Sequence, residues 1–506
     1  MTCPENSRSS GTLSASNRNQ NAMPPGARPV IFTMIGGGAH RLLSTVRGAL
    51  KEGVFREGGE LRCYDLDAVR AQVMAEMIQK SPEFRANPEK VTIRWDLTLE
   101  QALEGADVVS VTLLAGGARA MNLSSELGWS FGFLGSDNVS YPGAFLALRG
   151  APILLNIART MERVCPNAIL LDFANPVAVL SCMVSTYTKI RCYGVCEGHN
   201  NHGYDLTRLL TGKDAYNPDY DVLVAGINHA SFIVEGSLHG EDLFALLDRR
   251  LAEVENPVEL LEVGPYVSDV AREWLRFGLG KIISLYKNRR ALLFSGEADG
   301  FSHYFHEDAL IHHGASLSHD GELLSADAMR TLAAADAHGR ADRDAANAAF
   351  AAYARRNADD IPWNDPALHL FSVAARGDVQ CKVLSGLSGA CVTRVAVSAP
   401  NTGAVLNIGE GMALEYSHTA DRDGLHPIEG LKVPEGVYGM TASLAAHQTL
   451  LARACFTRDP RDLHEALLSY PIGSDTTAAR ELWCRLTLAS KETIDPAYQG
   501  LLNLLK

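Results

Sequence analysis

The chain has 506 residues, of which 46% are hydrophobic and 21% charged, a composition typical of a soluble globular protein. That length exceeds what one hydrophobic core supports, so two domains are expected. The formal net charge of −13, without a basic stripe, argues against nucleic acid or an anionic membrane as partner, and no apolar run is long enough to span a bilayer.

The first 28 residues are rich in serine, asparagine, glycine and proline and lack the apolar segment of a secretory signal. They are predicted to form a disordered tail. The ten cysteines are scattered singly, with no CxxC pair. This pattern suits a reducing cytosol, where thiols pack as small hydrophobic groups, so we expect a cytoplasmic protein.

The first ordered segment, "PVIFTMIGGGAHR", is a β-rich apolar run that ends in Gly36, Gly37 and Gly38. Leucines and valines at helical spacing follow in "LLSTVRGALKE". A strand, a glycine turn and a helix form the phosphate cradle of a dinucleotide fold, because glycines let backbone N–H groups approach a pyrophosphate. The match to GxGxxG is imperfect, since Arg41 stands where the third glycine belongs.

A second expected strand, in "GELRCYDLD", ends in Asp65 and Asp67, close to the spacing at which a dinucleotide fold places its ribose-binding carboxylate. We expect Asp65 to accept both ribose hydroxyls of an adenosine. Because a carboxylate repels a 2′-phosphate, this residue favours NAD over NADP. Asp67 is expected to cap the following helix.

Three further strands are predicted in "ADVVSVTLLAGG", "NAILLDFANP" and "IRCYGVCEGH". They end near Gly116 and Gly117, Asn175, and Cys196 respectively. Helical stretches such as residues 145–164 alternate with them, which predicts a doubly wound parallel sheet of the Rossmann type. Ligands of such a sheet bind at the carboxyl ends of its strands, where all these residues are expected to lie.

The turn "GVCEGHNNHG" combines a thiol, a carboxylate and two imidazoles, which could be metal ligands, acid–base groups, a redox site or ordinary loop polarity. His229 follows 33 residues after Cys196, in a β-rich run that is interrupted at residues 226–229. A thiolate and an imidazole, with positions left open for substrate oxygens, would hold a divalent transition metal. The spacing alone also fits a core cysteine and a satisfied polar histidine, which are the more common arrangement of such residues.

The second half of the chain is mixed. An alanine-rich helical region covers residues 328–360, a hairpin is expected within residues 392–417, and the C-terminal segments have helical spacing. We therefore predict a disordered tail at 1–28, a Rossmann-like NAD-binding domain at 29–200, and an α+β domain at 201–506 for substrate, metal and oligomerisation. A homodimer or homotetramer is expected.

In their order along the chain these segments resemble the NAD- and divalent-metal-dependent glycosidases of glycoside hydrolase family 4, whose fold is related to lactate and malate dehydrogenases. The resemblance runs from about residue 29 to near the C-terminus. It is carried by "IGGGA", "YDLD", "LEGADVVSVTLLAGG", "YPGAFLALRGAP", "CPNAILLDFANPVAVL", "YGVCEGH", "AGINHASF", "DGFSHYF", "APNTGAVLNI" and "LHEALLSYPI".

The resemblance implies that Cys196 and His229 bind Mn²⁺ or a similar ion and that Asn175 contacts sugar hydroxyls. The variable tetrapeptide beginning at Cys196 ends in Gly-His, as in the branch that acts on α-linked uronic acids, which places His199 at the substrate. Its second position departs from that branch and carries Glu197. A branch acting on 6-phospho-α-glucosides has an acid catalyst at this position, a role that Glu197 could take.

The reaction implied by the resemblance is a redox-assisted elimination: oxidation at C3 of the sugar, deprotonation at C2, loss of the aglycone, water addition and re-reduction. Tyr304 and Asp299 are the candidate C2 bases. Arg149 and Arg119 are expected at the exposed edge as cationic partners of an anionic sugar, and His303 near the metal or substrate.

The sequence therefore predicts an NAD- and Mn²⁺-dependent glycosidase, with an α-galacturonide or α-glucuronide as the favoured small carbohydrate substrate. A 6-phospho-α-glycosidase of the same family and a plain NAD-dependent dehydrogenase of sugars or 2-hydroxy acids stay open as alternatives. So does a catalytically silent sugar- or nucleotide-binding regulator.

Overall fold

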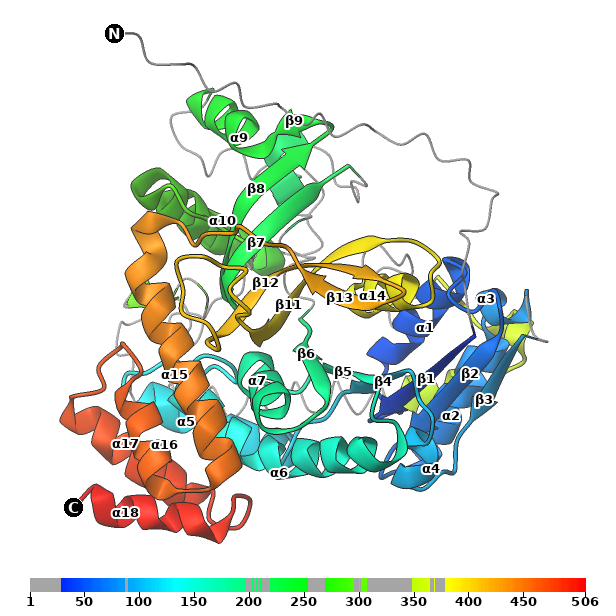
Figure 1. Ribbon diagram of the computed structural model, residues 1–506, viewed down its shortest axis with the longest axis horizontal. Helices are drawn as coiled ribbons and strands as arrows, with labels where there is room; N and C mark the ends of the chain where they lie inside the picture. Colours follow the sequence, from blue (N-terminus) through cyan, green and yellow to red (C-terminus); the bar gives the residue numbers. More distant parts are fainter. Residues whose placement is uncertain are drawn as a thin grey trace, which may run out of the picture.

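A computed structural model describes residues 29–86, 90–196, 203, 206–207, 209–211, 219–253, 269–294, 300, 302–306, 348–364, 368 and 378–506, with the backbone alone at 269–278. Its centre is one mixed sheet of 13 strands (Figure 1). The main path through the sheet has the order β10-β8-β7-β12-β11-β6-β5-β4-β1-β2-β3, and the short strands β9 and β13 pair with β8 and β12.

Six parallel strands form one part of this sheet. They are β1 (Val30–Ile35), β2 (Gly59–Tyr64), β3 (Val91–Arg94), β4 (Val108–Val111), β5 (Ile169–Asp172) and β6 (Arg191–Gly194). Their order, 3-2-1-4-5-6, is that of a doubly wound dinucleotide-binding sheet, so the predicted Rossmann-like class is confirmed.

The remaining strands extend the sheet beyond β6 and run antiparallel to their neighbours. They are β7 (Asp221–Ile227), β8 (Ala230–Leu238), β9 (Glu241–Asp242), β10 (Leu292–Leu293), β11 (Thr393–Pro400), β12 (Ala413–Asp421) and β13 (Gly424–Pro427). The predicted hairpin is the pair β11–β12, and its strands lie between β6 and β7.

Helices connect and cover the strands. They are α1 (Arg41–Lys51), α2 (Ala68–Lys80), α3 (Pro82–Arg85), α4 (Leu99–Leu103), α5 (Gly117–Ser130), α6 (Tyr141–Val164), α7 (Val177–Tyr187), α9 (Leu243–Ala252), α10 (Asp269–Arg289), α14 (Val379–Leu387), α15 (Tyr438–Thr457), α16 (Pro460–Leu468), α17 (Thr477–Ala489) and α18 (Leu501–Leu504). Short 3₁₀ turns are η2 (Ala358–Asp360), η5 (Glu435–Val437) and η6 (Pro496–Gly500).

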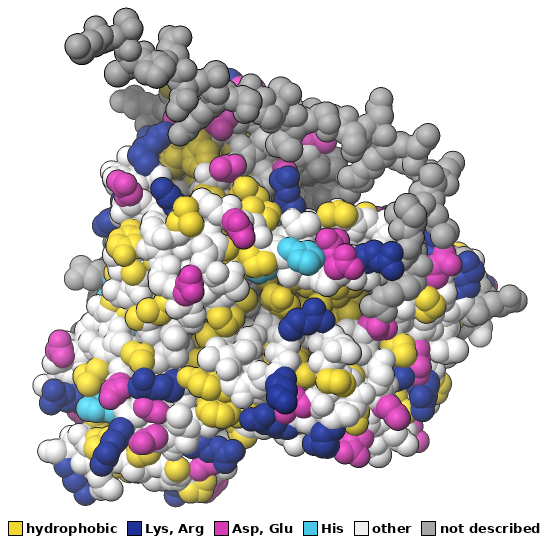
Figure 2. All heavy atoms as spheres, in the orientation of Figure 1, with side chains coloured by type: hydrophobic (Ala, Val, Ile, Leu, Met, Phe, Trp, Pro, Cys, Tyr) yellow, Lys and Arg dark blue, Asp and Glu magenta, His cyan; other side chains and the backbone are white. Residues whose placement is uncertain are grey.

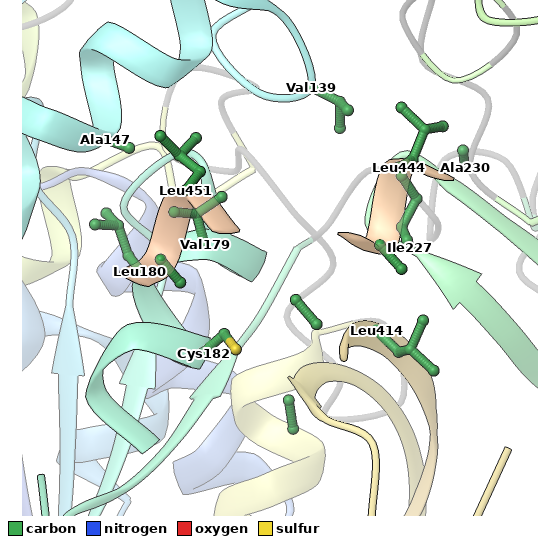
Figure 3. Close-up of a cluster of buried hydrophobic side chains, with 14 of the residues drawn as sticks. Val139, Ala147, Val179, Leu180, Cys182, Ile227, Ala230, Leu414, Leu444 and Leu451 are labelled. Atoms are coloured by element: carbon green, nitrogen blue, oxygen red, sulfur yellow. The ribbon is translucent and has the colours of Figure 1, made fainter. Parts of the chain in front are cut away.

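The parallel strands have a hydrophobic cluster on each face. On β5, for example, Ile169 and Leu171 belong to one cluster and Leu170 to the other, because successive side chains of a strand point to opposite faces. Figure 3 shows part of one cluster, in which Val179 and Leu180 of α7 lie with Leu451 of α15. Both clusters include residues from before and after position 200.

The division into domains at residues 200 and 201 stays a prediction, and the sheet itself continues across this position. Gly194 of β6 is paired with Ser398 of β11. The hydroxyl of Thr45, in α1, donates to Asp378, at the start of α14. The two halves of the chain therefore share both strand pairing and buried polar contacts.

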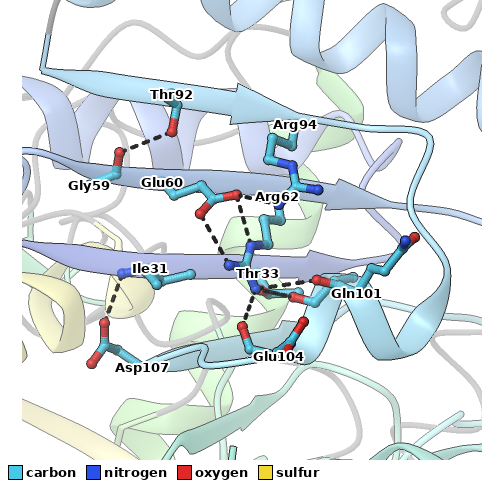
Figure 4. A network of polar contacts seen from close by, with 11 residues as sticks. Ile31, Thr33, Gly59, Glu60, Arg62, Thr92, Arg94, Gln101, Glu104 and Asp107 are labelled. Atoms are coloured by element: carbon cyan, nitrogen blue, oxygen red, sulfur yellow. Dashed lines mark hydrogen bonds and ion pairs between the residues drawn. The ribbon is translucent and has the colours of Figure 1, made fainter. Parts of the chain in front are cut away.

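A polar network joins β1 and β2 to the C-terminal end of α4 (Figure 4). The guanidinium of Arg62, on β2, donates to the carboxylate of Glu60 and to the carbonyl of Ala102 at 3.1 Å. The hydroxyl of Thr33 donates to the same carbonyl at 2.6 Å. A buried arginine is thus satisfied by a carboxylate and by carbonyls at a helix C-terminus, which fixes β1 and β2 against α4.

On the face seen in Figure 2, acidic and basic side chains are intermixed. No helix in the described part of the chain combines the length and the apolar character that crossing a bilayer requires.

Candidate functional site

The carboxyl ends of β1, β4, β5 and β6 meet at one edge of the sheet, because these strands are parallel. Just beyond these ends the chain places Gly36, Thr112, Asn175 and Cys196 respectively. The strand order reverses between β1 and β4, which is where doubly wound sheets open a crevice for a ligand. This edge of the sheet is therefore the candidate ligand site.

The glycine turn after β1 has no room for larger side chains. Gly36 has a φ of +75°, and a Cβ there would stand 1.8 Å from the carbonyl oxygen of Thr112. A Cβ on Gly38 would stand 2.5 Å from the Cβ of Arg70 and 3.1 Å from the carboxylate of Asp65. These glycines bring the backbone close to its neighbours, as a cradle for a pyrophosphate requires.

Asp65 lies directly beside this turn, as predicted for a residue that binds the ribose. Its carboxylate accepts from the N–H of Gly38 at 3.0 Å and from the N–H of Asp67 at 3.0 Å. Asp67 caps α2 by accepting from the N–H groups of Val69 and Arg70. The predicted helix cap at Asp67 is confirmed, and the ribose-binding role of Asp65 stays a prediction.

Gly116 and Gly117 begin α5, with φ values of +79° and +71°. Arg119 lies in the first turn of this helix and is exposed. It therefore stands at the ligand edge with its side chain open to solvent, where the sequence predicts it.

The expectation that Arg149 is exposed at this edge is wrong. Arg149 lies inside α6 and is 4% exposed. Its guanidinium donates to the hydroxyls of Ser124, Ser490 and Thr493 at 2.8, 2.7 and 3.2 Å. Burial lowers the pKa of this group to about 10. The polar partners come from α5 and from the turn after α17, far away in sequence, which is why the sequence does not show them.

Asn175 is half-buried at the end of β5, and its amide donates to the carboxylate of Asp137 at 2.9 Å. Asp137 is a site residue that sequence reasoning missed. It precedes α6 and approaches the edge only through the fold.

Cys196 and His229 lie together at this edge. Cys196 follows β6, and His229 lies in the turn between β7 and β8 with a φ of +66°. The sulfur of Cys196 is 3.6 Å from Nε2 of His229. A soft thiolate and an imidazole in contact at a ligand edge are suited to a divalent transition metal.

The distance between these two atoms fits binding of one ion by both. A sulfur about 2.3 Å and a nitrogen about 2.1 Å from a metal stand about 3.1 to 3.6 Å apart for angles of roughly 90–110°. Within the described residues no group of three or more His, Cys, Asp and Glu side chains is arranged to hold an ion.

A buried polar network contacts the residues on both sides of His229. Glu415, on β12, accepts from Nδ2 of Asn228 at 2.8 Å and from the hydroxyl of Ser231 at 2.7 Å. Nδ2 of Asn138 donates to Oδ1 of Asn228 at 2.7 Å. Burial raises the pKa of Glu415, whereas Ser231, Asn228 and His229 act in the opposite direction.

None of these network residues is predicted as a site residue from the sequence. Asn228 stood beside the predicted ligand, and Glu415 was a carboxylate inside an otherwise apolar stretch, "GMALEYS". That position, in a strand buried on both faces, is the signal that could have singled it out.

Residues 300 and 302–306 approach the His229 turn from another side. A Cβ on Gly300 would stand 1.8 Å from the carbonyl oxygen of His229. Tyr304 contacts the ring of Phe232, on β8, with centroids 6.2 Å apart. Burial raises the pKa of Tyr304 to about 12, which by itself disfavours a phenolate base. Its role as the C2 base stays a prediction.

His303 is 5% exposed and contacts the ring of Tyr470 edge-on, with centroids 6.1 Å apart. Its predicted place in the metal or substrate site stays a prediction. Glu197, His199 and Asp299 lie outside the described residues.

Two sequence models of one protein family match the chain. The model for family 4 glycosyl hydrolases matches residues 31–211, and the model for their C-terminal domain matches residues 224–472.

The chain is similar in sequence to several glycosidases. An α-galactosidase of Bacillus subtilis (strain 168) is 30% identical over 44% of this chain and 51% of its own length. An α-galacturonidase of the same organism is 23% identical over 82% of this chain and 87% of its own length. The chain thus spans about half the length of the α-galactosidase that it matches.

A 6-phospho-β-glucosidase from Thermotoga maritima, solved with manganese, NAD⁺ and glucose-6-phosphate, has a similar fold. It superposes with a TM-score of 0.68 and 17% identity over 92% of this chain and 100% of that chain. A 6-phospho-α-glucosidase from gut microorganisms, solved with NAD and Mn²⁺, gives a TM-score of 0.69 at 17% identity over 92% and 99% of the two chains.

Proposed function

Because this chain belongs to family 4 of the glycosyl hydrolases, we propose that it is an NAD- and divalent-metal-dependent glycosidase that cleaves an α-linked uronic acid. The observation that carries the proposal is the contact of 3.6 Å between Cys196 and His229 at the edge that also bears the glycine turn and Asp65. A redox-assisted elimination needs a metal ion and a dinucleotide bound next to the same sugar. The two proposed metal ligands and the dinucleotide cradle therefore have to lie at one edge.

NAD and a divalent metal such as manganese, when bound, supply a hydride acceptor for C3 of the sugar and a Lewis acid for its C2 and C3 oxygens. Cys196 and His229 would hold the metal. Gly36, Gly37 and Gly38 would present the backbone to the pyrophosphate, Gly116 and Gly117 would line the cofactor, and Asp65 would accept the ribose hydroxyls.

The remaining predicted residues act on the sugar. Asn175 binds its hydroxyls, oriented by its hydrogen bond to Asp137. Either Tyr304 or Asp299 takes the C2 proton; for Tyr304 a nearby cation would have to lower the raised pKa of the phenol. Glu197 protonates the leaving oxygen.

An anionic sugar is favoured by two observations. The matched α-galacturonidase aligns over 87% of its length, and Arg119 is exposed at the ligand edge, where it can meet a carboxylate. His199 and His303 are proposed to complete the contacts to the substrate.

We also propose that the protein works in the cytoplasm as a homodimer or homotetramer. No disulfide bond joins the cysteines in the described part of the chain, which suits a reducing compartment.

The test is a panel of nitrophenyl substrates: α-galacturonide, α-glucuronide, α-galactoside, and 6-phospho-α- and 6-phospho-β-glucosides. Each is incubated with NAD⁺ and Mn²⁺ under reducing conditions, and nitrophenol release and absorbance at 340 nm are followed together. We expect release from an α-uronide without net formation of NADH, because the hydride returns to the sugar in each turnover.

The Cys196→Ser variant should lose activity and Mn²⁺ binding while keeping its affinity for NAD⁺. Cleavage of a phosphoglucoside alone would reassign the substrate. Steady accumulation of NADH without cleavage would instead identify a dehydrogenase.

A further inference from the structure

Glu415 is a buried carboxylate whose two oxygens are directed at the turn that carries His229. It is 1% exposed. Oε1 accepts from Asn228, the residue before His229, and Oε2 accepts from Ser231, two residues after it. One carboxylate therefore spans the turn and holds it on both sides of the predicted metal ligand.

Other contacts make this turn rigid. Gly300 lies against the carbonyl of His229, and Asn138 binds Asn228 from the start of α6. Figure 3 shows Ile227 and Ala230, at the two ends of the turn, on the same side as Leu414, the neighbour of Glu415 in β12. Gly300, Asn138 and Glu415 therefore all contact the turn that carries His229.

The charge of Glu415 has no lysine or arginine partner in the described part of the chain. Its hydrogen-bond donors, Asn228 and Ser231, are neutral. Burying an ionised carboxylate is costly unless it is paired or lies near a metal ion. A divalent cation on Cys196 and His229 would supply the missing positive charge, because the thiolate and Glu415 together carry two negative charges.

We propose that Glu415 is a positioning residue for the metal: it fixes the His229 turn by two hydrogen bonds and provides a buried counter-charge that favours a divalent cation on Cys196 and His229. This inference rests on the proposed function, since it presumes that this pair binds the metal. Groups that orient a metal-binding histidine commonly change metal affinity by 10–100-fold when they are removed.

The direct test measures binding of Mn²⁺ itself, without substrate, by calorimetric titration and by the loss of the free-ion electron paramagnetic resonance signal. In Glu415→Gln the side chain keeps its size but loses its charge. We expect its Kd for Mn²⁺ to rise about 10–100-fold. Its affinity for NAD⁺, measured by fluorescence, should equal that of the wild type.

Asp378→Asn is the matched control. Asp378 is also a buried carboxylate that accepts two hydrogen bonds, from Thr45 and from the N–H of Cys381, but these belong to α1 and α14. Its substitution should leave Mn²⁺ affinity unchanged, which separates a charge beside His229 from a buried charge in general.

A swapped pair, Asn228→Asp with Glu415→Gln, tests the charge more sharply. The swap returns one carboxylate to the network, reverses one hydrogen bond, and leaves the introduced carboxylate able to accept from Asn138. We expect its Kd for Mn²⁺ to lie within about threefold of the wild type, which a purely space-filling role of Glu415 does not predict. If Glu415→Gln alone fails to fold, as judged by circular dichroism, the folded swap decides the question.

The possible failures are distinct. Absence of Mn²⁺ binding by the wild type would overturn the proposed function itself. Binding by the wild type that Cys196→Ser abolishes, together with an unchanged Kd in Glu415→Gln, would overturn only the role of Glu415. An equal loss of affinity for NAD⁺ and Mn²⁺ in Glu415→Gln would reduce Glu415 to a general structural residue.

Discussion

At the scale of single residues, the candidate site shows that neighbouring identical side chains can have different tasks. Asp65 and Asp67 are two positions apart on one loop. Asp65 is turned toward the N–H of Gly38 in the cofactor cradle, whereas Asp67 accepts from the first N–H groups of α2. Only the first position can bind a ribose while it contacts the glycine turn.

This difference predicts the behaviour of two conservative variants. Asp65→Asn should raise the Kd for NAD⁺ about 10–100-fold, because a hydrogen bond to a charged group is worth about 1.5–3 kcal/mol. Its preference for NAD⁺ over NADP⁺ should fall as well. Asp67→Asn should bind NAD⁺ normally, since asparagine caps helices as well as aspartate. Fluorescence titration measures both, and a larger effect at Asp67 would reverse the assignment.

The sequence predicted those residues that follow their strand ends directly: Gly36, Asp65, Asn175, Cys196. Each could be placed because parallel strands end at one edge. The partners of these residues could not be predicted, because Asp137 and Glu415 reach the site only after α6 and β12 are in position. Arg149 was misjudged for the same reason, since two of its three hydroxyl partners, Ser490 and Thr493, lie more than 300 residues further along the chain.

At the scale of elements, the turn between β1 and α1 is held by close contact with the next strand in space. Gly36 faces the carbonyl of Thr112, just beyond β4, and Thr112 donates its N–H to Ile35 of β1 at 2.9 Å. The chain after β1 can thus approach the end of β4 closely because Gly36 has no side chain.

Gly36→Ala should therefore be far more damaging than an ordinary replacement of a glycine with positive φ. Gly240 is the control: its φ is +78°, but no atom lies within 4 Å of a Cβ built there. Gly240→Ala should lower the free energy of unfolding by about 1–2 kcal/mol, the cost of the left-handed backbone. Gly36→Ala adds a steric clash, for a total of roughly 3–5 kcal/mol. Urea unfolding measures both, and equal losses would contradict the close approach of the two strands.

At the scale of the whole molecule, buried titratable groups couple stability to pH. Burial lowers the pKa of both His418 and His447 to about 4, from an ordinary value of 6.5. The unfolded chain therefore binds more protons than the folded chain between pH 6.5 and 4. Their contribution to stability is complete above pH 6.5 and is lost as the pH falls toward 4. Burial raises the pKa of Asp172 and Asp378, which acts in the opposite sense in the acid range.

The variant His447→Gln separates one of these contributions from the rest. Glutamine can still donate to the carbonyl of Ala466, which His447 contacts at 2.7 Å. Between pH 6.5 and 4 the free energy of unfolding should depend on pH less steeply in the variant, by up to about 1.4 kcal/mol per pH unit. Guanidinium titrations at several pH values give this slope. Parallel curves for the two proteins would show that His447 is not protonated on unfolding.

The order of strands in the sheet has a consequence for how the protein is made. Cys196 follows β6 and His229 follows β7, yet β11 and β12, from residues 393–421, lie between these two strands. During synthesis Cys196 and His229 leave the ribosome early. The β11–β12 hairpin, which lies between β6 and β7 in the sheet, leaves it only after about two hundred more residues. A nascent chain can thus complete its parallel strands long before Cys196 and His229 come together, and we expect this contact to form late in biosynthesis.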